Sequence, residues 1–284
     1  MTSNSKSTLL VTNDDGVTSP ALIPLIDALN GLGAVARVNT LVPDRERSWI
    51  AKSISRFDEI EVRKRERSGN EPRIMTASGT PADCTNLGVY RVFDGKPDLV
   101  VSGVNIGLNH GLGFMMSSGT VGAAAEGAVA GLPAIAISIG AVGDGHGSFV
   151  DYALSDAGAE LWERSAAVSA DIVASVLEHG IPGGVDLLNV NLPKDATLET
   201  PRVVTDVARV GYNALFSSED SSRYVFDYRG LNELKSSEVS TDSSALREGM
   251  ISITPLQLPH AAPFEGALHD ALTKRPAKTS ARPS

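Results

Sequence analysis

The chain has 284 residues, a formal net charge of −9 and a single cysteine. The length allows one large domain or two small ones, and the acidic balance argues against binding of nucleic-acid duplexes through a basic surface. The single cysteine, Cys84, excludes an intrachain disulfide framework and a cysteine metal cluster, and we interpret it as a core residue of a helix.

The first residues are polar and lack the apolar core of a signal peptide. Along the rest of the chain, no apolar run approaches the roughly 18 residues that a membrane helix requires. These features predict a cytoplasmic protein that does not interact with a membrane.

A short buried strand is predicted at residues 9–11, where apolar residues follow one another without interruption. It ends in an Asn-Asp-Asp-Gly sequence at residues 13–16, whose glycine permits a sharp turn. Apolar residues at helical spacing then predict a helix at residues 21–32. Asp14 and Asp15 therefore lie at the carboxyl end of a strand, the edge where open α/β sheets bind ligands. The alternative is an Asx turn that only caps the helix.

Alternating apolar and charged residues predict further strands before residue 80. Their ranges are 36–42, 57–65 and 73–77. A polar loop at residues 43–49 follows the first of them, and a turn at residues 68–72 joins the other two as a hairpin. Thr80 and Pro81 predict a helix start, with Thr80 as the cap and Pro81 in the first position.

A long segment at residues 103–119 follows a buried strand predicted at residues 98–102. It is rich in Gly, Asn and Ser and has no periodicity, so we predict a functional loop. Its last residues enter an Ala-rich helix at residue 121. A helix N-terminus presents unpaired amides and the positive end of a dipole, so the region 118–120 is a candidate anion site.

Strands and helices continue to alternate as far as residue 201, with a flexible stretch at residues 140–147 between them. The predicted elements are a strand at 134–139, a helix at 160–179 and a strand at 185–191. This alternation predicts an α/β fold, a mostly parallel sheet with helices on both faces.

The pattern fades after residue 201, where we predict short strands separated by polar, turn-rich spacers. The strands are 202–210, 224–228 and 250–255, and the spacers are 217–222 and 235–244. This region is predicted to form a projecting β-hairpin arm or a subunit contact. The tail from about residue 269 is basic and poor in apolar residues, so we expect disorder there.

Several chemistries lack their motifs in this sequence: there is no Walker A motif, no complete dinucleotide fingerprint and no Gly-x-Ser-x-Gly elbow. The five histidines are scattered and not paired at the spacing of zinc ligands; His110 is best interpreted as a solvated loop residue. What remains is a set of oxygen donors at the predicted strand ends, suited to Mg²⁺ or Mn²⁺. A cation beside an anion-binding helix end suits phosphoryl transfer.

The sequence resembles the stationary-phase survival protein SurE family of metal-dependent 5′/3′-nucleotidases. Four blocks carry the resemblance: Asn13-Asp14-Asp15-Gly16, Pro43-Asp44-Arg45 with Ser48, the stretch 102–109, and Ser118-Gly119-Thr120-Val121 with Glu126. Further similar blocks are 78–84, 241–249 and 253–256. The blocks follow the family order and cover roughly residues 8–258.

The resemblance implies a Rossmann-like three-layer core and the dephosphorylation of nucleoside 5′- and 3′-monophosphates. It implies one Mg²⁺ or Mn²⁺ ion per subunit and catalysis at Asp14 and Asp15. The implied metal ligands are Asp14, Asp15, Ser48 and Asn105, and the implied phosphate contacts are Asn109, Ser118, Gly119 and Thr120. In the mechanism that we infer, amides at 118–120 and the amide of Asn109 bind phosphate oxygens while water attacks phosphorus.

The resemblance also implies a dimer or tetramer with exchanged C-terminal segments. We therefore expect one catalytic domain at residues 1–265, in which residues 211–246 form an arm used in oligomerisation. Residues 266–284 are expected to form a disordered tail.

The sequence departs from the family around the expected substrate rim. Trp49 and Ala51 stand where the family usually has a glycine and a serine, and Ser117 stands where an aromatic residue is common. Trp49 either stacks on a base or caps the pocket, or else it is wedged between the loop and the core. Two other functions remain open: a hydrolase of a non-nucleotide phosphate such as polyphosphate, and a non-catalytic nucleotide-binding regulator.

Overall fold

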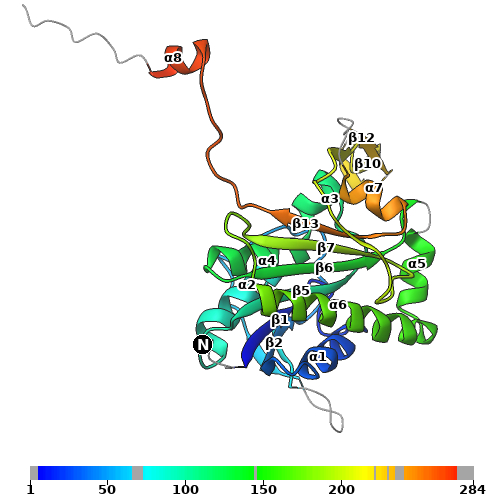
Figure 1. Ribbon diagram of the computed structural model, residues 1–284. Coiled ribbons are helices and arrows are strands. Elements are labelled where there is room, and N and C mark those ends of the chain that lie inside the picture. The colour runs from blue at the N-terminus through cyan, green and yellow to red at the C-terminus, as the bar shows by residue number, and fades with distance from the viewer. Residues whose placement is uncertain are drawn as a thin grey trace, which may run out of the picture.

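The computed structural model describes residues 6–65, 73–143, 146–220, 222–228, 230–233 and 240–273. Within these residues, nine strands form one sheet (Figure 1). In spatial order they are β3 (Val62–Lys64), β4 (Met75–Ala77), β2 (Val35–Pro43), β1 (Ser7–Thr12), β5 (Leu99–Ile106), β6 (Ala134–Gly140), β7 (Leu187–Pro193), β13 (Ile251–Leu256) and β8 (Arg202–Val204).

Neighbouring strands from β4 through β2, β1, β5 and β6 to β7 are all parallel. The hairpin partner β3 and the late strand β13 are antiparallel to their neighbours β4 and β7. The predicted mostly parallel α/β sheet is therefore confirmed. Parallel strands bring their carboxyl ends to one edge of the sheet, which is where β1 and β5 deliver their polar residues.

Helices cover both faces of the sheet (Figure 1). On one face, α1 (Leu22–Asn30) and α6 (Ala159–His179) pack against the larger apolar cluster, which includes the alternate β6 residues Ile135, Ile137 and Ile139. On the other face, α2 (Pro81–Leu87) and α4 (Gly119–Val129) lie over smaller residues. The Ala- and Gly-rich surface of α4 permits this close approach: a Cβ on Gly127 would lie 2.8 Å from Val100 Cγ2.

The predicted helix start at Thr80 is confirmed in detail. The Thr80 hydroxyl accepts a hydrogen bond from the Asp83 amide at 3.0 Å, and the Asp83 carboxylate accepts one from the Thr80 amide at 2.8 Å. This reciprocal capping box satisfies two backbone donors that would otherwise lack partners. Cys84 follows in α2 and is buried, as predicted, and burial raises the pKa of its thiol.

The prediction of a loop at residues 103–119 is wrong. β5 continues to Ile106 through a register shift between Ser102 and Asn105, and α3 (Gly111–Ser117) fills most of the remainder. The glycines had suggested a loop, but Gly103 is needed because a Cβ there would collide with the carbonyl oxygen of Ile137 in the neighbouring strand. Close packing, and not flexibility, explains this glycine.

Two other expectations are corrected, one in the first third and one in the last third of the chain. Most of residues 57–65 is irregular, and only β3 is a strand, since Phe57 is fully in solvent and finds no sheet face to pack on. The polar spacer at 217–222 is largely a strand, β10 (Phe216–Asp220), which pairs with β11 (Arg223–Phe226). Its exposure explains the polar sequence.

Short elements complete the C-terminal part: β9 (Val210–Tyr212), β12 (Leu231–Glu233), α7 (Asp242–Arg247) and α8 (Ala267–Thr273). The predicted spacer at 235–244 thus ends in a helix, and the tail begins with one where disorder was expected. Residues 274–284 and the predicted turn at 68–72 lie outside the described residues. The predicted flexible stretch at 140–147 lies partly outside them, and α5 (His146–Ala153) begins within it.

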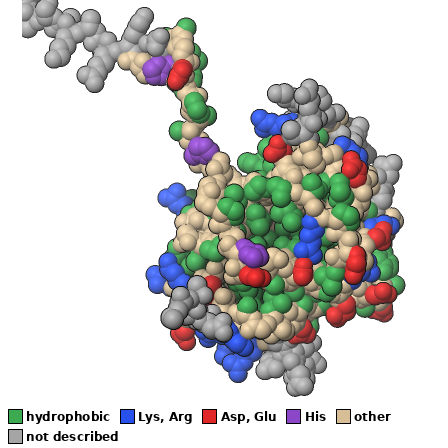
Figure 2. Space-filling view, viewed as in Figure 1, with side chains coloured by type: hydrophobic (Ala, Val, Ile, Leu, Met, Phe, Trp, Pro, Cys, Tyr) green, Lys and Arg blue, Asp and Glu red, His purple; other side chains and the backbone are tan. Residues whose placement is uncertain are grey.

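The tail leaves the sheet after β13 and carries α8 away from the body (Figures 1 and 2). In the space-filling view, apolar side chains gather on the body over the region where Figure 1 places β7 and β13. Leu268 and Leu272 on α8 and Phe264 before it are also exposed. Among the described helices, none is long and apolar enough to cross a lipid bilayer.

Candidate active site

The acidic turn follows β1 at the carboxyl edge of the sheet. Asn13 closes it: its Nδ2 donates to the Gly16 carbonyl oxygen, and its Oδ1 accepts from the Gly16 amide, both at 3.1 Å. Gly16 has φ +82°, and a Cβ there would lie 2.6 Å from the Arg45 carbonyl carbon. The helix cap of α1 is Ala21, which makes no side-chain capping bond. The aspartates therefore do not serve as helix caps, and the turn leaves both carboxylates for other partners.

Asp14 faces the start of α4. The Thr120 hydroxyl donates a 2.6 Å hydrogen bond to Asp14 Oδ1, across 106 residues of sequence. Gly119 also packs against Asp14, because a Cβ on this residue would be 2.9 Å from Asp14 Oδ2 and 2.8 Å from Asp14 Cβ. The absent side chain lets the peptide approach the carboxylate, so Asp14 and the N-terminus of α4 share one small space.

Asp15 faces the end of β5. Its Oδ2 accepts a 3.0 Å hydrogen bond from the Ile106 amide, next to Asn105. The Asn105 side chain donates from Nδ2 to the Gly107 carbonyl oxygen at 2.6 Å. This bond fixes the amide group, and among the described residues no donor bonds Asn105 Oδ1. The structure thus brings three of the predicted metal ligands, Asp14, Asp15 and Asn105, to the adjoining ends of β1 and β5.

The electrostatics of the pair are unfavourable without a cation. Burial raises the pKa of Asp14 to about 6, against smaller lowering effects from hydrogen bonds with Thr120. Burial also raises the pKa of Asp15 well above its usual value, and the neighbouring charge of Asp14 raises it further. Within the described residues neither carboxylate forms an ion pair. A bound divalent cation would offset both the burial and the repulsion, so this donor set fits Mg²⁺ or Mn²⁺.

Ser48 lies on the loop after β2, which is bound to the acidic turn by the Arg47 amide at 2.7 Å from the Asp14 carbonyl oxygen. Its hydroxyl is exposed and donates a 2.7 Å hydrogen bond to Glu46 Oε1. Because this hydroxyl gives its proton to Glu46, its lone pairs remain for another partner. Among the hydrogen bonds of the described residues, none joins Ser48 to either aspartate.

Glu46 is a residue that the sequence interpretation missed. Its charge raises the pKa of both Asp14 and Asp15, which places it within electrostatic range of the pair. In the sequence, only its position two residues before Ser48 indicated that Glu46 could lie near the site. In the described part of the chain, no group of three or more His, Cys, Asp or Glu side chains is arranged to hold a metal ion. A metal here would therefore combine carboxylates with neutral oxygen donors.

Ser118 caps α4, and its hydroxyl oxygen accepts a 3.1 Å hydrogen bond from the Val121 amide. Gly119 and Thr120 follow in the first turn, where backbone amides have no partner within the helix. α4 has 11 residues and no acidic side chain in its first turn. The Val121 amide is used by the Ser118 cap, and the Thr120 backbone is hydrogen-bonded to Asp14, so the start of α4 lies directly beside the predicted cation ligands. The anion site at this helix end stays a prediction.

Asn109 lies within a network of hydrogen bonds inside the chain. Its backbone amide donates to Asn191 Oδ1 at 2.7 Å. Its side chain donates to Ser138 Oγ at 2.8 Å, and its carbonyl oxygen accepts from Asn189 Nδ2 at 2.8 Å. A buried polar network across β6 and β7 thus engages Asn109 and seats the segment after β5, and its contact with phosphate stays a prediction.

His110 is also not the solvated residue that we expected. It is buried, and its Nδ1 lies 2.8 Å from Ser243 Oγ in α7. Asp242, the neighbour of Ser243, accepts hydrogen bonds from the Gly111 amide at 2.8 Å and the Ala208 amide at 3.0 Å. Burial lowers the pKa of His110. This network attaches the start of α3 to the C-terminal segments, and its long sequence separation explains why it could not be foreseen.

Trp49 is 39% exposed and packs among aromatic rings from distant segments. Its ring centroid lies 5.8 Å from that of Phe114, 5.5 Å from Tyr212, 5.3 Å from Phe226 and 6.2 Å from Tyr228. These partners belong to α3, β9, β11 and the segment after β11. The ring partners of Trp49 belong to the arm and α3 and not to the core, and stacking on a base or capping of the pocket stays a prediction.

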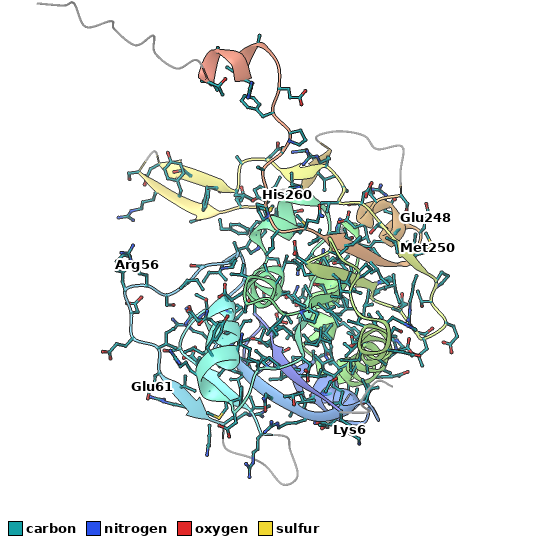
Figure 3. The ribbon with its side chains drawn as sticks, turned by 60° about the vertical axis from the view of Figure 1, so that its left-hand side comes forward. Lys6, Arg56, Glu61, Glu248, Met250 and His260 are labelled. Atoms are coloured by element: carbon teal, nitrogen blue, oxygen red, sulfur yellow. The ribbon has the colours of Figure 1, made fainter. Side chains whose placement is uncertain are left out.

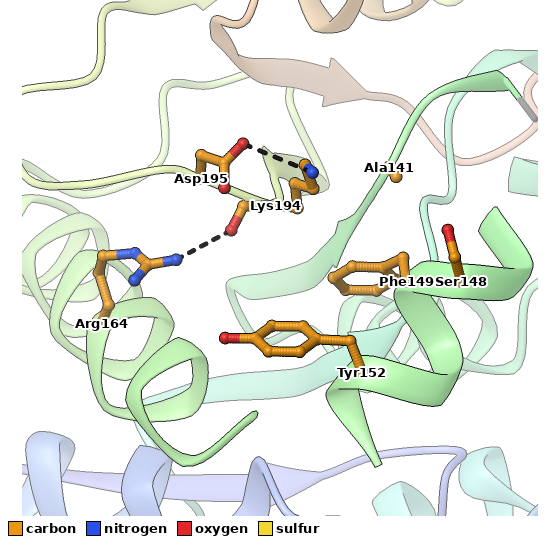
Figure 4. Close-up of a pocket in the computed structure, with 7 residues that line it drawn as sticks. All are labelled: Ala141, Ser148, Phe149, Tyr152, Arg164, Lys194 and Asp195. Atoms are coloured by element: carbon orange, nitrogen blue, oxygen red, sulfur yellow. Dashed lines mark hydrogen bonds and ion pairs between the residues drawn. The ribbon is translucent and has the colours of Figure 1, made fainter. Parts of the chain in front are cut away.

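A separate cavity of about 320 Å³ lies between α5, the start of α6 and the end of β7 (Figure 4). It contains none of the predicted site residues. Its two cations are engaged, since Arg164 donates to the carbonyl oxygens of Ala196 and Lys194 at 3.0 and 3.1 Å, and Lys194 lies 3.9 Å from Asp195. The cations therefore hold the loop after β7, and the candidate site remains the acidic edge.

Comparison with known proteins shows which family this chain is similar to. The family described as Survival protein SurE matches residues 9–215. A 5′-nucleotidase SurE of Desulfatibacillum aliphaticivorans is 39% identical over 254 residues, covering 88% of this chain and 91% of that protein. A 5′-nucleotidase SurE of Methanothrix thermoacetophila is 36% identical over 272 residues, covering 93% and 98%.

Among solved structures, the SurE protein from Aquifex aeolicus matches with a TM-score of 0.67 and 33% sequence identity. The match covers 89% of this chain and 94% of that one. The relatives span nearly the whole sequence, and the family match includes the acidic turn, Asn105 and the start of α4. The chain therefore belongs to the SurE family.

Proposed function

We propose that the protein is a metal-dependent phosphomonoesterase that hydrolyses nucleoside 5′- and 3′-monophosphates to nucleoside and phosphate. The observation that carries this proposal is the meeting of Asp14 with Thr120 and of Asp15 with the end of β5. A buried acidic pair beside a helix N-terminus suits the charges of a phosphate ester and its cation. The relatives named 5′-nucleotidase SurE support the nucleotide as substrate.

One Mg²⁺ or Mn²⁺ ion per subunit is held by the two aspartates together with Ser48 and Asn105. When bound, the ion supplies charge neutralisation for the phosphoryl group. The chain's own groups do the positioning: the Thr120 hydroxyl orients Asp14, and the Ile106 amide orients Asp15. Asp14 and Asp15 are the proposed catalytic residues.

Phosphate binds at the start of α4, where Ser118, Gly119 and Thr120 present the helix terminus. Water attacks phosphorus, the bond to the nucleoside oxygen breaks, and that oxygen leaves with a proton. Trp49 is proposed to line the nucleoside side of the site from the loop that also carries Ser48. Asn109 remains a proposed phosphate contact through its side chain. The hydrogen bond with Ser138 Oγ holds that side chain in place.

We further propose that residues 1–265 act as one catalytic unit in the cytoplasm, as a dimer or tetramer. Residues 211–246 form the arm that contacts another subunit, and residues 266–284 form a tail. Phe216, Tyr224 and Val225 on the β10–β11 hairpin are all exposed, which supports a partner for this hairpin. The hairpin projects from the body in Figure 3.

The test is release of phosphate from AMP by purified protein with Mn²⁺, with and without EDTA. We expect turnover that EDTA abolishes and Mn²⁺ restores, and that is lost in Asp14→Asn. A panel containing AMP, 3′-AMP, polyphosphate and ribose 5-phosphate separates a nucleotidase from a hydrolase of other phosphates. Nucleotide binding without any phosphate release would support a regulator and contradict the proposal.

A further inference from the structure

Five aromatic rings form a cluster above the candidate site: Trp49, Phe114, Tyr212, Phe226 and Tyr228. Trp49 is its centre, since its ring meets each of the others in tilted or edge-on geometry. Phe114 and Tyr228 also meet each other at 5.5 Å. The cluster joins the loop after β2 to the hairpin that projects from the same side in Figure 3, where Arg56 marks the continuation of that loop.

The backbone of Trp49 is in a conformation that side chains rarely adopt. Its φ is +58°, and Ala51 has φ +52°. A residue with a Cβ is disfavoured there and persists only when surrounding contacts hold it. The side-chain contacts of Trp49 that can hold this conformation are the rings of the cluster, beside the backbone contacts of the neighbouring residues.

Two backbone hydrogen bonds attach this loop to the candidate site, one on each side of Trp49. The Arg47 amide donates to the Asp14 carbonyl oxygen at 2.7 Å, and the Ala51 amide donates to the Ser117 carbonyl oxygen at 2.9 Å. Ser48 lies between these two attachments, and its hydroxyl bonds only Glu46 of the same loop. Side chains on both sides of Ser48 reach other parts of the fold: the Arg47 guanidinium donates to the Ser78 carbonyl oxygen at 2.6 Å, and the Trp49 ring meets the rings of the arm.

We propose that Trp49 is a positioning residue through which the C-terminal arm holds the Ser48 loop against the acidic turn. The arm rings fix the Trp49 ring, the ring fixes the strained backbone, and the backbone sets the place of Ser48. The consequence for metal binding rests on the proposed function, whereas the positioning itself does not. A free stacking platform for a base is disfavoured, because neighbouring rings already occupy much of the Trp49 surface.

Phe226→Ala is the informative variant. Phe226 contacts Trp49 and, at 6.3 Å, Phe216, and it lies in the arm outside all the proposed metal and phosphate contacts. Trp49→Ala removes the centre of the cluster, and Trp49→Phe keeps a ring there. Tyr90→Ala is the matched control, since Tyr90 is a half-exposed aromatic residue whose ring meets only Lys96 among the described residues.

The first readout is hydrogen exchange of peptides covering residues 44–51 in metal-free protein. We expect exchange about 2- to 10-fold faster in Phe226→Ala and Trp49→Ala, as the loss of one aromatic contact implies. Trp49→Phe and Tyr90→Ala should exchange like the parent. The double variant Trp49→Ala/Phe226→Ala should exchange no faster than Trp49→Ala, because Phe226 acts through Trp49. Unchanged exchange in Phe226→Ala, or additive effects in the double variant, would overturn the proposal.

The second readout is the dissociation constant of Mn²⁺ alone, measured by calorimetry without substrate. We expect binding to weaken about 2- to 10-fold in the two Ala variants and to recover in Trp49→Phe. If the parent binds no Mn²⁺ while the exchange results hold, the proposed function fails and the positioning stands. If all variants bind Mn²⁺ like the parent, the proposed link from the arm to the metal is wrong.

Discussion

The carboxyl edge of the sheet and the C-terminal arm differ in what holds their residues in place. At the edge, strand ends and individual hydrogen bonds hold Asp14 and Asp15 in buried positions. In the arm, β10 and β11 pair with each other, and their apolar side chains face solvent. The difference teaches that the site chemistry belongs to the rigid layer of the fold, which is the main sheet with its covering helices. The arm is held to that layer mainly by aromatic rings and depends on partners beyond its own strands.

The largest effect is expected from a substitution in the acidic turn itself. Asp14→Asn removes one charge of the pair while keeping the shape of the side chain, so we expect turnover of AMP to fall by about 10³-fold or more. Tyr224→Ala in the exposed arm is the matched control and should change subunit assembly more than turnover. Steady-state kinetics with Mn²⁺ measures both. Turnover of Asp14→Asn within a few-fold of the parent would contradict the assignment.

A smaller effect is expected from the hydroxyl that orients Asp14. Thr120→Val keeps the volume and removes the 2.6 Å hydrogen bond, so kcat/KM should fall by about 10- to 100-fold, as for other groups that orient a metal ligand. Thr120→Ser keeps the hydroxyl and should recover most of the activity. Equal losses in both variants would indicate that packing, and not the hydrogen bond, is what matters at residue 120.

The pH dependence of stability sharpens the comparison in the absence of metal. Burial raises the pKa of Asp14 to about 6 in the folded protein, from an ordinary value near 3.8 in the unfolded chain. The folded state therefore binds this proton more tightly, and its contribution is complete below about pH 4 and lost as the pH rises through 6. Metal-free parent should lose about 1.4 kcal/mol of stability relative to Asp14→Asn between pH 5 and 7.5, because about one pH unit of this range lies below the folded pKa.

Thermal unfolding of both proteins at the two pH values, with EDTA, measures this difference. Mn²⁺ should restore the stability of the parent at pH 7.5 and have little effect on Asp14→Asn. A parent that gains stability relative to the variant as the pH rises would show that the carboxylate is already compensated in the folded chain.

The smallest expected effect concerns the backbone of the loop that links the two regions. Ala51 has φ +52°, where glycine is favoured, so Ala51→Gly should raise the free energy of unfolding by about 0.5–1 kcal/mol. Ala128→Gly in α4 is the control and should lower it by about 1 kcal/mol, because helical φ favours alanine. Urea unfolding measures both, and destabilisation by Ala51→Gly would contradict the observed conformation.

Much of the rigid layer could be predicted from the sequence, because its signals are local. The apolar run before Asp14, the helical spacing after it and the Thr80-Pro81 cap each determine their own element. The register of a parallel sheet then brings the strand ends together without further information. The approach of Asp14 to α4 followed from that rule.

The remaining features depend on contacts between distant segments. α3 was missed because its glycines are typical of a loop and not of a helix. One of these glycines, Gly113, packs close to Tyr212. The use of the Asn109 amide by Asn191 depends on a residue 82 positions away. The rings around Trp49 come from positions 114 to 228, and no local pattern announces such a meeting.

Gly119 has a consequence for how this protein tolerates sequence change. The backbone of this residue packs directly against Asp14, and the space between them has no room for a Cβ atom. Selection at this codon thus acts on side-chain volume alone, whatever the polarity of the substituted residue. A saturation library at codon 119 should return glycine as the sole active clone, whereas a library at exposed Met116, three residues earlier in α3, should return many.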